Sequence, residues 1–340
     1  MSIKTLCSFL LLFICSHQLF AQSAPSPQHK YVFTVAKDGS GDYKFIQDAI
    51  DAMRAFPLSR ITLYIKNGVY NEKIELPAFN TDVSFIGESV DKTIISFSDY
   101  SGRGKQTTFT SYTAKISGNR FVAENITFVN AAGPVGQAVA LHVDADQAIF
   151  KNCKFLGNQD TIYASGEQSR QLFINCFIEG TTDFIFGPAT AVFQDCTIRA
   201  KSNSYITAAN TPAWKKYGFV LLHCKIIADS SVQKLFLGRP WRAYAKTAFI
   251  ECELPAQIVP EGWDNWSNAA NEKTAEYVEY NNRGEGAVTD KRVAWSKQLS
   301  AREAKKYTLE NIFAASSVAA DDSAWFLSMP TQAFSWPATK

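Results

Sequence analysis

The sequence holds two aspartates whose positions suggest that they act as a pair. Asp160 follows Cys153 by seven residues, and Asp183 follows Cys176 by the same interval. If the two phrases are successive repeats of one shape, their carboxyl groups lie close together on one face. Two neighbouring carboxyl groups do not both ionise easily, so one should keep its proton near neutral pH. A carboxylic acid beside a carboxylate is suited to ester cleavage, because one group attacks while the other donates and then accepts a proton.

The residues around each aspartate bear on this interpretation. Asp183 lies in GTTDFIFG, where Phe184, Ile185 and Phe186 predict a buried position or the floor of a cleft. Both surroundings perturb the pKa of a carboxyl group. Asp160 lies in GNQDTIY. The alternative for either aspartate is a structural role, because an aspartate after a strand often accepts hydrogen bonds from nearby turn amides.

Other familiar catalytic motifs are missing from the sequence. It contains no Gly-x-Ser-x-Gly elbow, no His-Glu-x-x-His and no P-loop, so the chemistries that depend on them are not expected. His142 and His223 fall within strand-like segments, and we expect both to be structural. The formal net charge is only +2 and there is no Lys/Arg run, which argues against a nucleic-acid partner.

A repeated phrase runs through the middle of the chain. Each copy has an apolar residue three positions before a cysteine and another two positions after it, as in FKNCKF and FINCFI. The cysteines are Cys153, Cys176, Cys196, Cys224 and Cys252, and Ile126 takes their place in an earlier copy. Steps of 27, 23, 20, 28 and 28 residues between short β-branched or aromatic strands are typical of a solenoid. We therefore predict an all-β fold, a single-stranded right-handed parallel β-helix in which equivalent residues stack about 4.8 Å apart.

The repeated cysteines allow two interpretations. The favoured one is a column of small buried side chains. The alternative is a disulfide between Cys176 and Cys196, since one coil step suits disulfide geometry and export would permit oxidation. No Cys-x-x-Cys or histidine pair accompanies the cysteines, so a zinc site is not expected.

The two ends of the repeat region predict short capping helices. Residues 42–56 carry apolar side chains at helical spacing, and we expect them to cap the N-terminal end of the solenoid. Residues 300–313 begin with Ser300 and have Glu303 three positions later, which is a capping box. We expect that helix to pack near the C-terminal end.

The first residues of the chain are typical of a signal peptide. Lys4 precedes an almost uninterrupted apolar run, and Ala21 is a suitable last residue before cleavage. The run is too short to span a bilayer, while Cys15 leaves a lipid anchor as a weaker alternative. We expect residues 1–21 to direct export to the periplasm or the cell exterior, and residues 22–340 to form one catalytic domain.

Several motifs, in order along the chain, resemble the pectin methylesterase (pectinesterase) family. The resemblance covers about residues 31–336 and includes GNQDTIY and GTTDFIFG around the paired aspartates. Further matching blocks are TTFTS (107–111), NAAGPVGQAVAL (130–141), LGRPW (237–241) and PEGWDNW (260–266). The resemblance implies a β-helical hydrolase, an aspartyl esterase that removes methyl esters from pectin during cell-wall modification or pectin degradation.

The resemblance also implies a role for each matching catalytic residue. Asp183 matches the nucleophile, and Asp160 matches the general acid and base. Gln137 and Gln159 match two glutamines that stabilise an oxyanion. Arg239 matches an arginine that hydrogen-bonds the nucleophile, and it would favour the ionised form of that carboxyl group.

The same resemblance implies that Trp241, Phe186 and Thr108 contact the sugar chain, together with Gln137 and Arg239. It implies no metal and no organic cofactor. The expected partner is pectin, or homogalacturonan, and we expect a monomer with no membrane span.

Two rival functions have sequence signatures that can be checked. A galacturonase on the same fold should carry further paired aspartates and Gly-His-Gly, and a calcium-dependent lyase should carry an acidic cluster; neither is apparent. A β-helical binding protein without activity is the non-enzyme alternative, but the five catalytic-type residues are all present.

Overall fold

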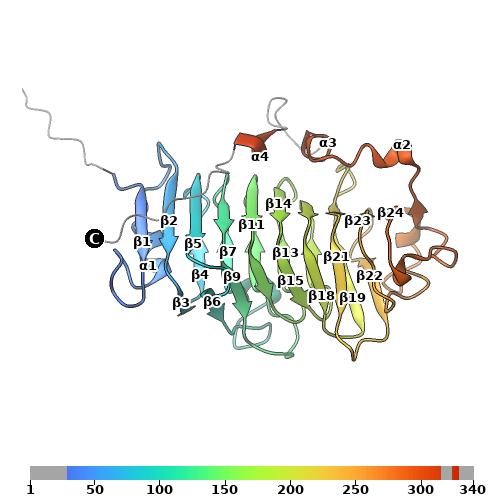
Figure 1. Cartoon of the computed structure of the whole chain (residues 1–340), viewed down its shortest axis with the longest axis horizontal. Coiled ribbons are helices and arrows are strands. Elements are labelled where there is room, and N and C mark those ends of the chain that lie inside the picture. Colours follow the sequence, from blue (N-terminus) through green and yellow to red (C-terminus); the bar gives the residue numbers. More distant parts are fainter. Residues whose placement is uncertain (1–28, 315–323, 329–340) are drawn as a thin grey trace, which may run out of the picture.

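The strands of the protein follow one another as parallel coils along a single axis (Figure 1). The computed structural model describes residues 29–314 and 324–328. The predicted signal peptide, residues 1–21, lies outside the described residues. In the middle of the described chain each coil contributes one strand to each of three parallel sheets, which the chain visits in a fixed order, while the coils at the two ends contribute to the first sheet only. This arrangement confirms the predicted parallel β-helix.

The strands are grouped by sheet as follows. The first sheet contains β1 (Val32–Val35), β2 (Ile61–Ile65), β5 (Val83–Gly87), β8 (Val122–Glu124), β11 (Ala148–Lys151), β14 (Arg170–Ile174), β17 (Thr190–Gln194), β20 (Phe219–Leu222), β23 (Lys246–Ile250), β24 (Glu276–Tyr280) and β25 (Lys297–Gln298). The second sheet contains β3 (Gly68–Asn71), β6 (Thr93–Phe97), β9 (Thr127–Asn130), β12 (Lys154–Leu156), β15 (Phe177–Gly180), β18 (Thr197–Ala200) and β21 (Lys225–Ala228). The third sheet contains β4 (Ile74–Leu76), β7 (Ala114–Ile116), β10 (Leu141–Val143), β13 (Ile162–Ala164), β16 (Ile185–Gly187), β19 (Ser204–Ala209) and β22 (Leu235–Pro240).

Stacked apolar side chains fill the interior of the solenoid. Phe150, Phe173 and Phe193 occupy equivalent positions in three successive strands of the first sheet. Their rings stack with centroid separations of 4.9 Å and 4.7 Å. Burial of such rings supplies most of the favourable free energy of folding. The same stacking fixes the register of the coils, because a slip of one residue would turn each ring to the outer face.

The cysteines lie inside the turns between the first and second sheets. All five are buried and free, as expected for a column of small core residues. The disulfide considered between Cys176 and Cys196 is therefore not formed. Each thiol instead donates to backbone oxygen of the preceding coil, as Cys176 Sγ does to the Phe150 oxygen at 3.3 Å.

The residue before each of these cysteines makes the turn possible. Asn152, Asn175 and Asp195 all have left-handed backbone conformations, with φ of 50°, 51° and 54°. Asparagine and aspartate adopt this conformation more readily than other residues with a side chain. A single left-handed residue thus turns the chain from one sheet into the next.

The N-terminal helix is shorter than predicted. Helix α1 spans Ile46–Asp51, whereas the sequence predicted a helix over residues 42–56. The amide of Asp42 donates to the Thr34 oxygen at 2.7 Å, so this part of the segment runs beside β1 instead of joining the helix. The first helical amides donate to the carboxylate of Glu72. Helix α1 still covers the N-terminal end, as expected, and contacts β1 and β4.

The prediction of one helix over residues 300–313 was wrong. The structure has α2 (Ala301–Ala304), α3 (Leu309–Ala314) and, later, α4 (Trp325–Ser328). The predicted capping box of Ser300 and Glu303 is present at α2. A second helix begins after Thr308, whose Oγ1 accepts a hydrogen bond from the Asn311 amide at 3.3 Å. This new helix start separates α3 from α2.

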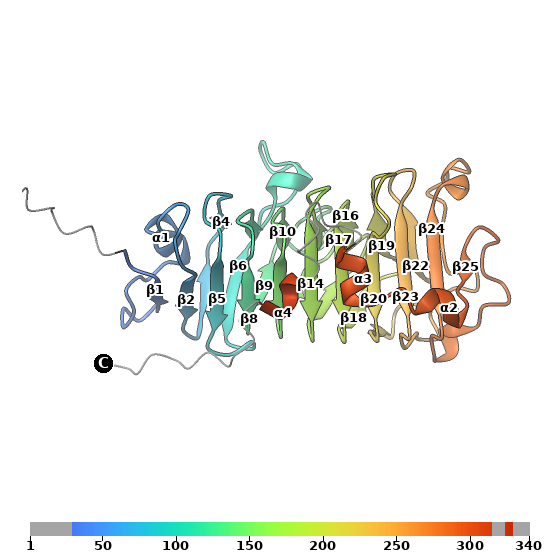
Figure 2. The same ribbon diagram turned by 90° about the horizontal axis from the view of Figure 1, so that it is seen from above.

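The C-terminal helices cover the outer face of the first sheet (Figures 1 and 2). Helix α2 lies near the C-terminal end of the solenoid, as predicted, but α3 and α4 run back along the sheet. They bury Ile312, Phe313, Trp325 and Phe326 against apolar side chains of the sheet such as Val192. This face therefore needs its helical cover to remain out of water.

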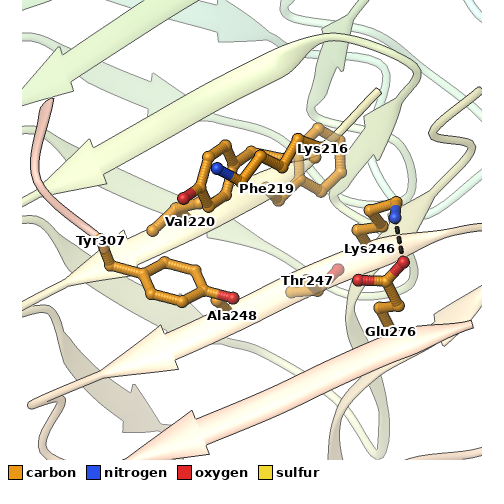
Figure 3. Close-up of a pocket in the computed structure, with 10 residues that line it drawn as sticks. Lys216, Phe219, Val220, Lys246, Thr247, Ala248, Glu276 and Tyr307 are labelled. Carbon is orange, nitrogen blue, oxygen red and sulfur yellow. Dashed lines mark hydrogen bonds and ion pairs between the residues drawn. The ribbon is translucent and has the colours of Figure 1, made fainter. Parts of the chain in front are cut away.

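The connection between α2 and α3 lies over the end of the same sheet. Tyr307 and the ion pair of Lys246 with Glu276 line one small pocket over β20 and β23 (Figure 3). A hollow of about 390 Å³ lies between this connection and β24, and Trp295 and Lys297 are among its lining residues. It opens on the first sheet, whereas the predicted site residues belong to the third sheet and the loops that lead into it. The described residues contain no helix long and apolar enough to cross a membrane.

Candidate active site

All the predicted catalytic and substrate-binding residues line a single cleft on the outer face of the third sheet. The cleft has a volume of about 340 Å³. Its lining residues are Thr108, Phe109, Gln137, Gln159, Asp160, Asp183, Phe186, Ala208, Arg239, Trp241 and Trp266. These residues span a long stretch of the sequence, and the winding of the chain brings them together.

The paired aspartates stand at the entrance to two adjacent strands. Ile162 of β13 pairs with Ile185 of β16, so Asp160 and Asp183, each two residues earlier, are neighbours across the coils. Both are buried, with exposed fractions of 6% and 5%. Both have left-handed backbone conformations, with φ of 67° and 50°. Such strain at a buried charged residue is typical of functional sites.

Arg239 holds the carboxylate of Asp183 with two hydrogen bonds. Its Nε donates to Oδ1 at 3.0 Å, and a terminal guanidinium nitrogen donates to Oδ2 at 2.7 Å. Arg239 lies on β22, two strands from Asp183, and the intervening β19 carries the small Ala208 at the equivalent position. The side chain of Ala208 leaves room for Arg239 to reach across.

Gly238 permits this close packing of β22 on β19. A Cβ atom at Gly238 would lie 2.0 Å from Thr207 Oγ1, far inside van der Waals contact. A larger residue would push β22 outward and move Arg239 away from Asp183. The close approach of Thr207 thus explains why the LGRPW motif has a glycine at this position, which the sequence alone did not reveal.

The two aspartates differ in their electrostatic surroundings. Burial, and then the charge of Asp183, raise the pKa of Asp160 to about 8, although Arg239 opposes the rise. Burial also raises the pKa of Asp183, but hydrogen bonds and charge from Arg239 oppose it directly. The proton shared by this pair at neutral pH therefore belongs on Asp160, and the negative charge on Asp183 beside the guanidinium.

Two glutamines lie next to the aspartates. The backbones of Gln137 and Gln159 pair as an isolated parallel bridge between adjacent coils, and the backbone amide of Ala138 donates to the backbone oxygen of Gln159 at 3.1 Å. Neither side-chain amide hydrogen-bonds another residue in the described part of the chain. Both are therefore free to donate to an oxygen atom of a bound molecule.

Aromatic rings form the remaining walls. Phe186 stacks on Tyr163 with centroids 4.6 Å apart and meets Trp241 edge-on at 5.9 Å. Phe109 is 45% exposed and lies next to Thr108 in a short 3-10 turn. Phe186 itself is buried, with an exposed fraction of 4%, so Phe109 is the ring of this wall that is open to a bound sugar.

Phe109, Ala208 and Trp266 also line the cleft but were not predicted from the sequence. Phe109 lies within TTFTS and Trp266 within PEGWDNW, so both motifs contained the signal. Nothing in the sequence distinguishes Ala208 from other small strand residues.

The histidines lie outside the cleft. His142 Nε2 is 2.8 Å from Asp144 Oδ1, and its ring lies against Tyr112 and Tyr163. His223 is half exposed in a turn, 3.2 Å from a Glu251 oxygen. Both positions fit the structural role that the sequence predicted. The described residues contain no cluster of three or more side chains suited to hold a metal ion.

Comparison with known proteins identifies the family of this chain. A family model described as Pectinesterase matches residues 32–316. The chain belongs to the pectinesterase family. The family predicted from the motifs is thus confirmed.

Individual relatives agree with this assignment. A probable pectinesterase/pectinesterase inhibitor of Brassica napus is 40% identical over 298 residues, covering 83% of this chain and 51% of the relative. Pectinesterase 2 of Citrus sinensis is 39% identical, with coverages of 83% and 58%. The chain therefore spans about half the length of such relatives.

Solved structures match over nearly their whole length. The pectin methylesterase from carrot is 36% identical, with a TM-score of 0.82 and coverages of 92% of this chain and 98% of that one. A pectin methylesterase from Erwinia chrysanthemi is 28% identical, with a TM-score of 0.73 and coverages of 84% and 97%.

Proposed function

We propose that this protein is a pectinesterase that hydrolyses the methyl esters of pectin, that is, of methyl-esterified homogalacturonan, to pectate and methanol. The observation that carries the proposal is the buried pair of Asp160 and Asp183, of which only Asp183 is bound by Arg239. Burial and the second carboxyl group favour a proton on Asp160, whereas Arg239 favours charge on Asp183. An acid and a nucleophile are thus available together at neutral pH.

The first chemical step is attack by Asp183. A carboxylate oxygen of Asp183 bonds to the ester carbonyl carbon, and the carbonyl electron pair moves to oxygen. The side-chain amides of Gln137 and Gln159 donate to this oxyanion. Neutral donors suit the task because they stabilise developing charge without titrating themselves.

Asp160 donates and accepts the protons of the reaction. It donates its proton to the methoxy oxygen as the carbon–oxygen bond breaks, which releases methanol and leaves an acyl anhydride on Asp183. The ionised Asp160 then removes a proton from water, and the resulting hydroxide attacks the anhydride. Breakdown then releases the carboxylate of Asp183 and the product carboxyl group, which ionises to pectate, while Asp160 keeps the proton that it took from water. No metal or organic cofactor enters these steps.

The cleft walls would bind the polysaccharide. Trp241 would contact sugar rings, with the largely buried Phe186 packed against it, while Thr108 and Arg239 would supply polar contacts. A solved pectin methylesterase that is 29% identical to this chain, with a TM-score of 0.72, is in complex with a hexasaccharide. That complex supports an extended sugar chain as the ligand here.

The remaining features complete the proposal. The protein would be exported to the periplasm or the cell exterior after removal of residues 1–21, and residues 22–340 would act as one monomeric catalytic domain. An exported enzyme would meet its polysaccharide substrate outside the cytoplasm.

Methanol release from highly methylated pectin tests the proposal. The wild type should release methanol, and Asp183→Ala should abolish the release while retaining the thermal unfolding midpoint. Release that persists in Asp183→Ala would overturn the assigned nucleophile but keep the esterase. A folded wild type that releases no methanol would overturn the esterase. Depolymerised or unsaturated products would then indicate a galacturonase or lyase, and binding alone a binding protein.

A further inference from the structure

The guanidinium of Arg239 lies between two aromatic rings. Its central carbon is 3.9 Å from the ring centroid of Tyr205 and 3.7 Å from that of Trp266. The Arg239 side chain is 20% exposed. Contacts this short are well within cation–π range, and they become stronger when water is excluded.

Both rings are held by their own neighbours. Tyr205 lies on β19 and stacks on Phe236 of β22, with centroids 5.1 Å apart and an interplanar angle of 24°. Trp266 has a left-handed backbone with φ of 62°, and its amide donates to Asp264 Oδ1 at 2.7 Å. The ring of Tyr205 thus has a packing partner besides Arg239, and the backbone of Trp266 is held by Asp264.

The two rings differ in their relation to the cleft. Trp266 lines the cleft, whereas Tyr205 does not. A change at Trp266 would alter both substrate contact and the support of Arg239. A change at Tyr205 would alter the support of Arg239 without removing a residue that lines the cleft.

We propose that Tyr205 is a positioning residue whose ring, with Trp266 opposite, fixes the plane of the Arg239 guanidinium and thereby orients the Asp183 carboxylate for attack. A planar guanidinium that donates two parallel hydrogen bonds fixes the plane of its carboxylate partner as well. This inference rests on the proposed esterase function. It adds a residue that neither the motifs nor the cleft lining identifies.

Kinetics of two variants test the role. Tyr205→Leu should lower kcat about tenfold, the scale of a lost desolvated cation–π contact. KM should change less than about twofold, because Tyr205 does not line the cleft. Tyr205→Phe keeps the ring face and should retain activity within about twofold of the wild type.

The pH profile separates positioning from simple packing. Arg239 lowers the pKa of Asp183, so loosening Arg239 should raise it. Since attack needs ionised Asp183, the acidic limb of the kcat/KM profile should move to higher pH in Tyr205→Leu. Trp214→Leu removes an aromatic ring that is 60% exposed and near Lys215, outside the cleft, and should leave the profile unchanged.

A second measurement does not depend on turnover. Carboxyl-carbon NMR of the protein, with the Asp183 signal assigned from Asp183→Asn, should show a higher Asp183 pKa in Tyr205→Leu. Tyr205→Met provides the same test if the leucine variant does not fold. Unchanged kcat, profile and Asp183 titration in a folded variant would overturn the proposal while leaving an active wild type as an esterase. Equal damage in Tyr205→Phe would overturn the role of the ring.

Discussion

The paired carboxyl groups predict an unusual link between pH and stability, which Asp160→Asn should remove. The pKa of Asp160 is raised from 3.8 to about 8, first by burial and then by Asp183. Between these values the unfolded chain releases a proton that the folded protein keeps. Raising the pH through this window therefore lowers the free energy of unfolding.

The size of the effect follows from the two pKa values. Each pH unit in the window costs about 1.4 kcal/mol. In strongly acidic solution Asp160 causes no loss; the loss of unfolding free energy through this group is then about 2 kcal/mol at pH 5 and about 6 kcal/mol at pH 9. The difference between pH 5 and pH 9 is about 4 kcal/mol, and rearrangement around the ionised group reduces it to about 2–4 kcal/mol.

Urea unfolding at pH 5, 7 and 9, followed by tryptophan fluorescence, measures this difference. The curve of Asp160→Asn should be flatter than that of the wild type by about 2–4 kcal/mol between pH 5 and pH 9. The same variant should lose about 10²–10⁴ in kcat, because an amide cannot donate and then accept the proton. Stability gained at alkaline pH would thus accompany lost activity.

Asp91→Asn serves as the matched control, since it makes the same chemical change at a side chain that is 70% exposed. Its curve should parallel that of the wild type. If the curves of Asp160→Asn and the wild type are also parallel, the folded protein does not keep the proton on Asp160. The assignment of Asp160 as the acid would then be refuted.

Two further predictions concern the oxyanion and the sugar chain. Gln159→Leu should lower kcat about 10²–10³-fold in methanol-release assays with little change in KM, because the lost amide acts only as the oxyanion forms; a rise in KM alone would assign Gln159 to substrate binding. Trp241→Ala should raise KM for polymeric pectin several-fold, while Tyr244→Ala, an exposed aromatic outside the cleft, should not. Equal KM values for both variants would remove Trp241 from the sugar-binding surface.

The repeat and the site motifs could be read from the sequence because both depend on local spacing. The cysteine phrases predicted the solenoid, and equal offsets from Cys153 and Cys176 predicted that Asp160 and Asp183 would be neighbours. In a parallel β-helix, residues at equal offsets in adjacent coils lie next to each other. Their spacing along the sequence therefore predicts which residues are neighbours in space. The structure pairs the flanking strands accordingly.

The sequence predicted the helix boundaries less accurately than the repeat. Apolar spacing over residues 42–56 fits a longer helix than α1, since backbone bonding to β1 competes with the start of the helix. The C-terminal prediction failed for a different reason, because Thr308 begins a new helix within a segment whose apolar pattern looks continuous. A tertiary contact decided the first boundary, and a local helix cap decided the second.

The sequence by itself determined the repeat, the family and the proposed catalytic residues, because these are properties of residue type and interval. Only the tertiary structure decided how Arg239 reaches Asp183 across Ala208, and that Tyr205 and Trp266 enclose it. Those contacts join positions that differ in coil and in offset, so no spacing along the chain predicts them. They depend on side-chain length, ring orientation and the exclusion of water, which exist only once the coils are stacked.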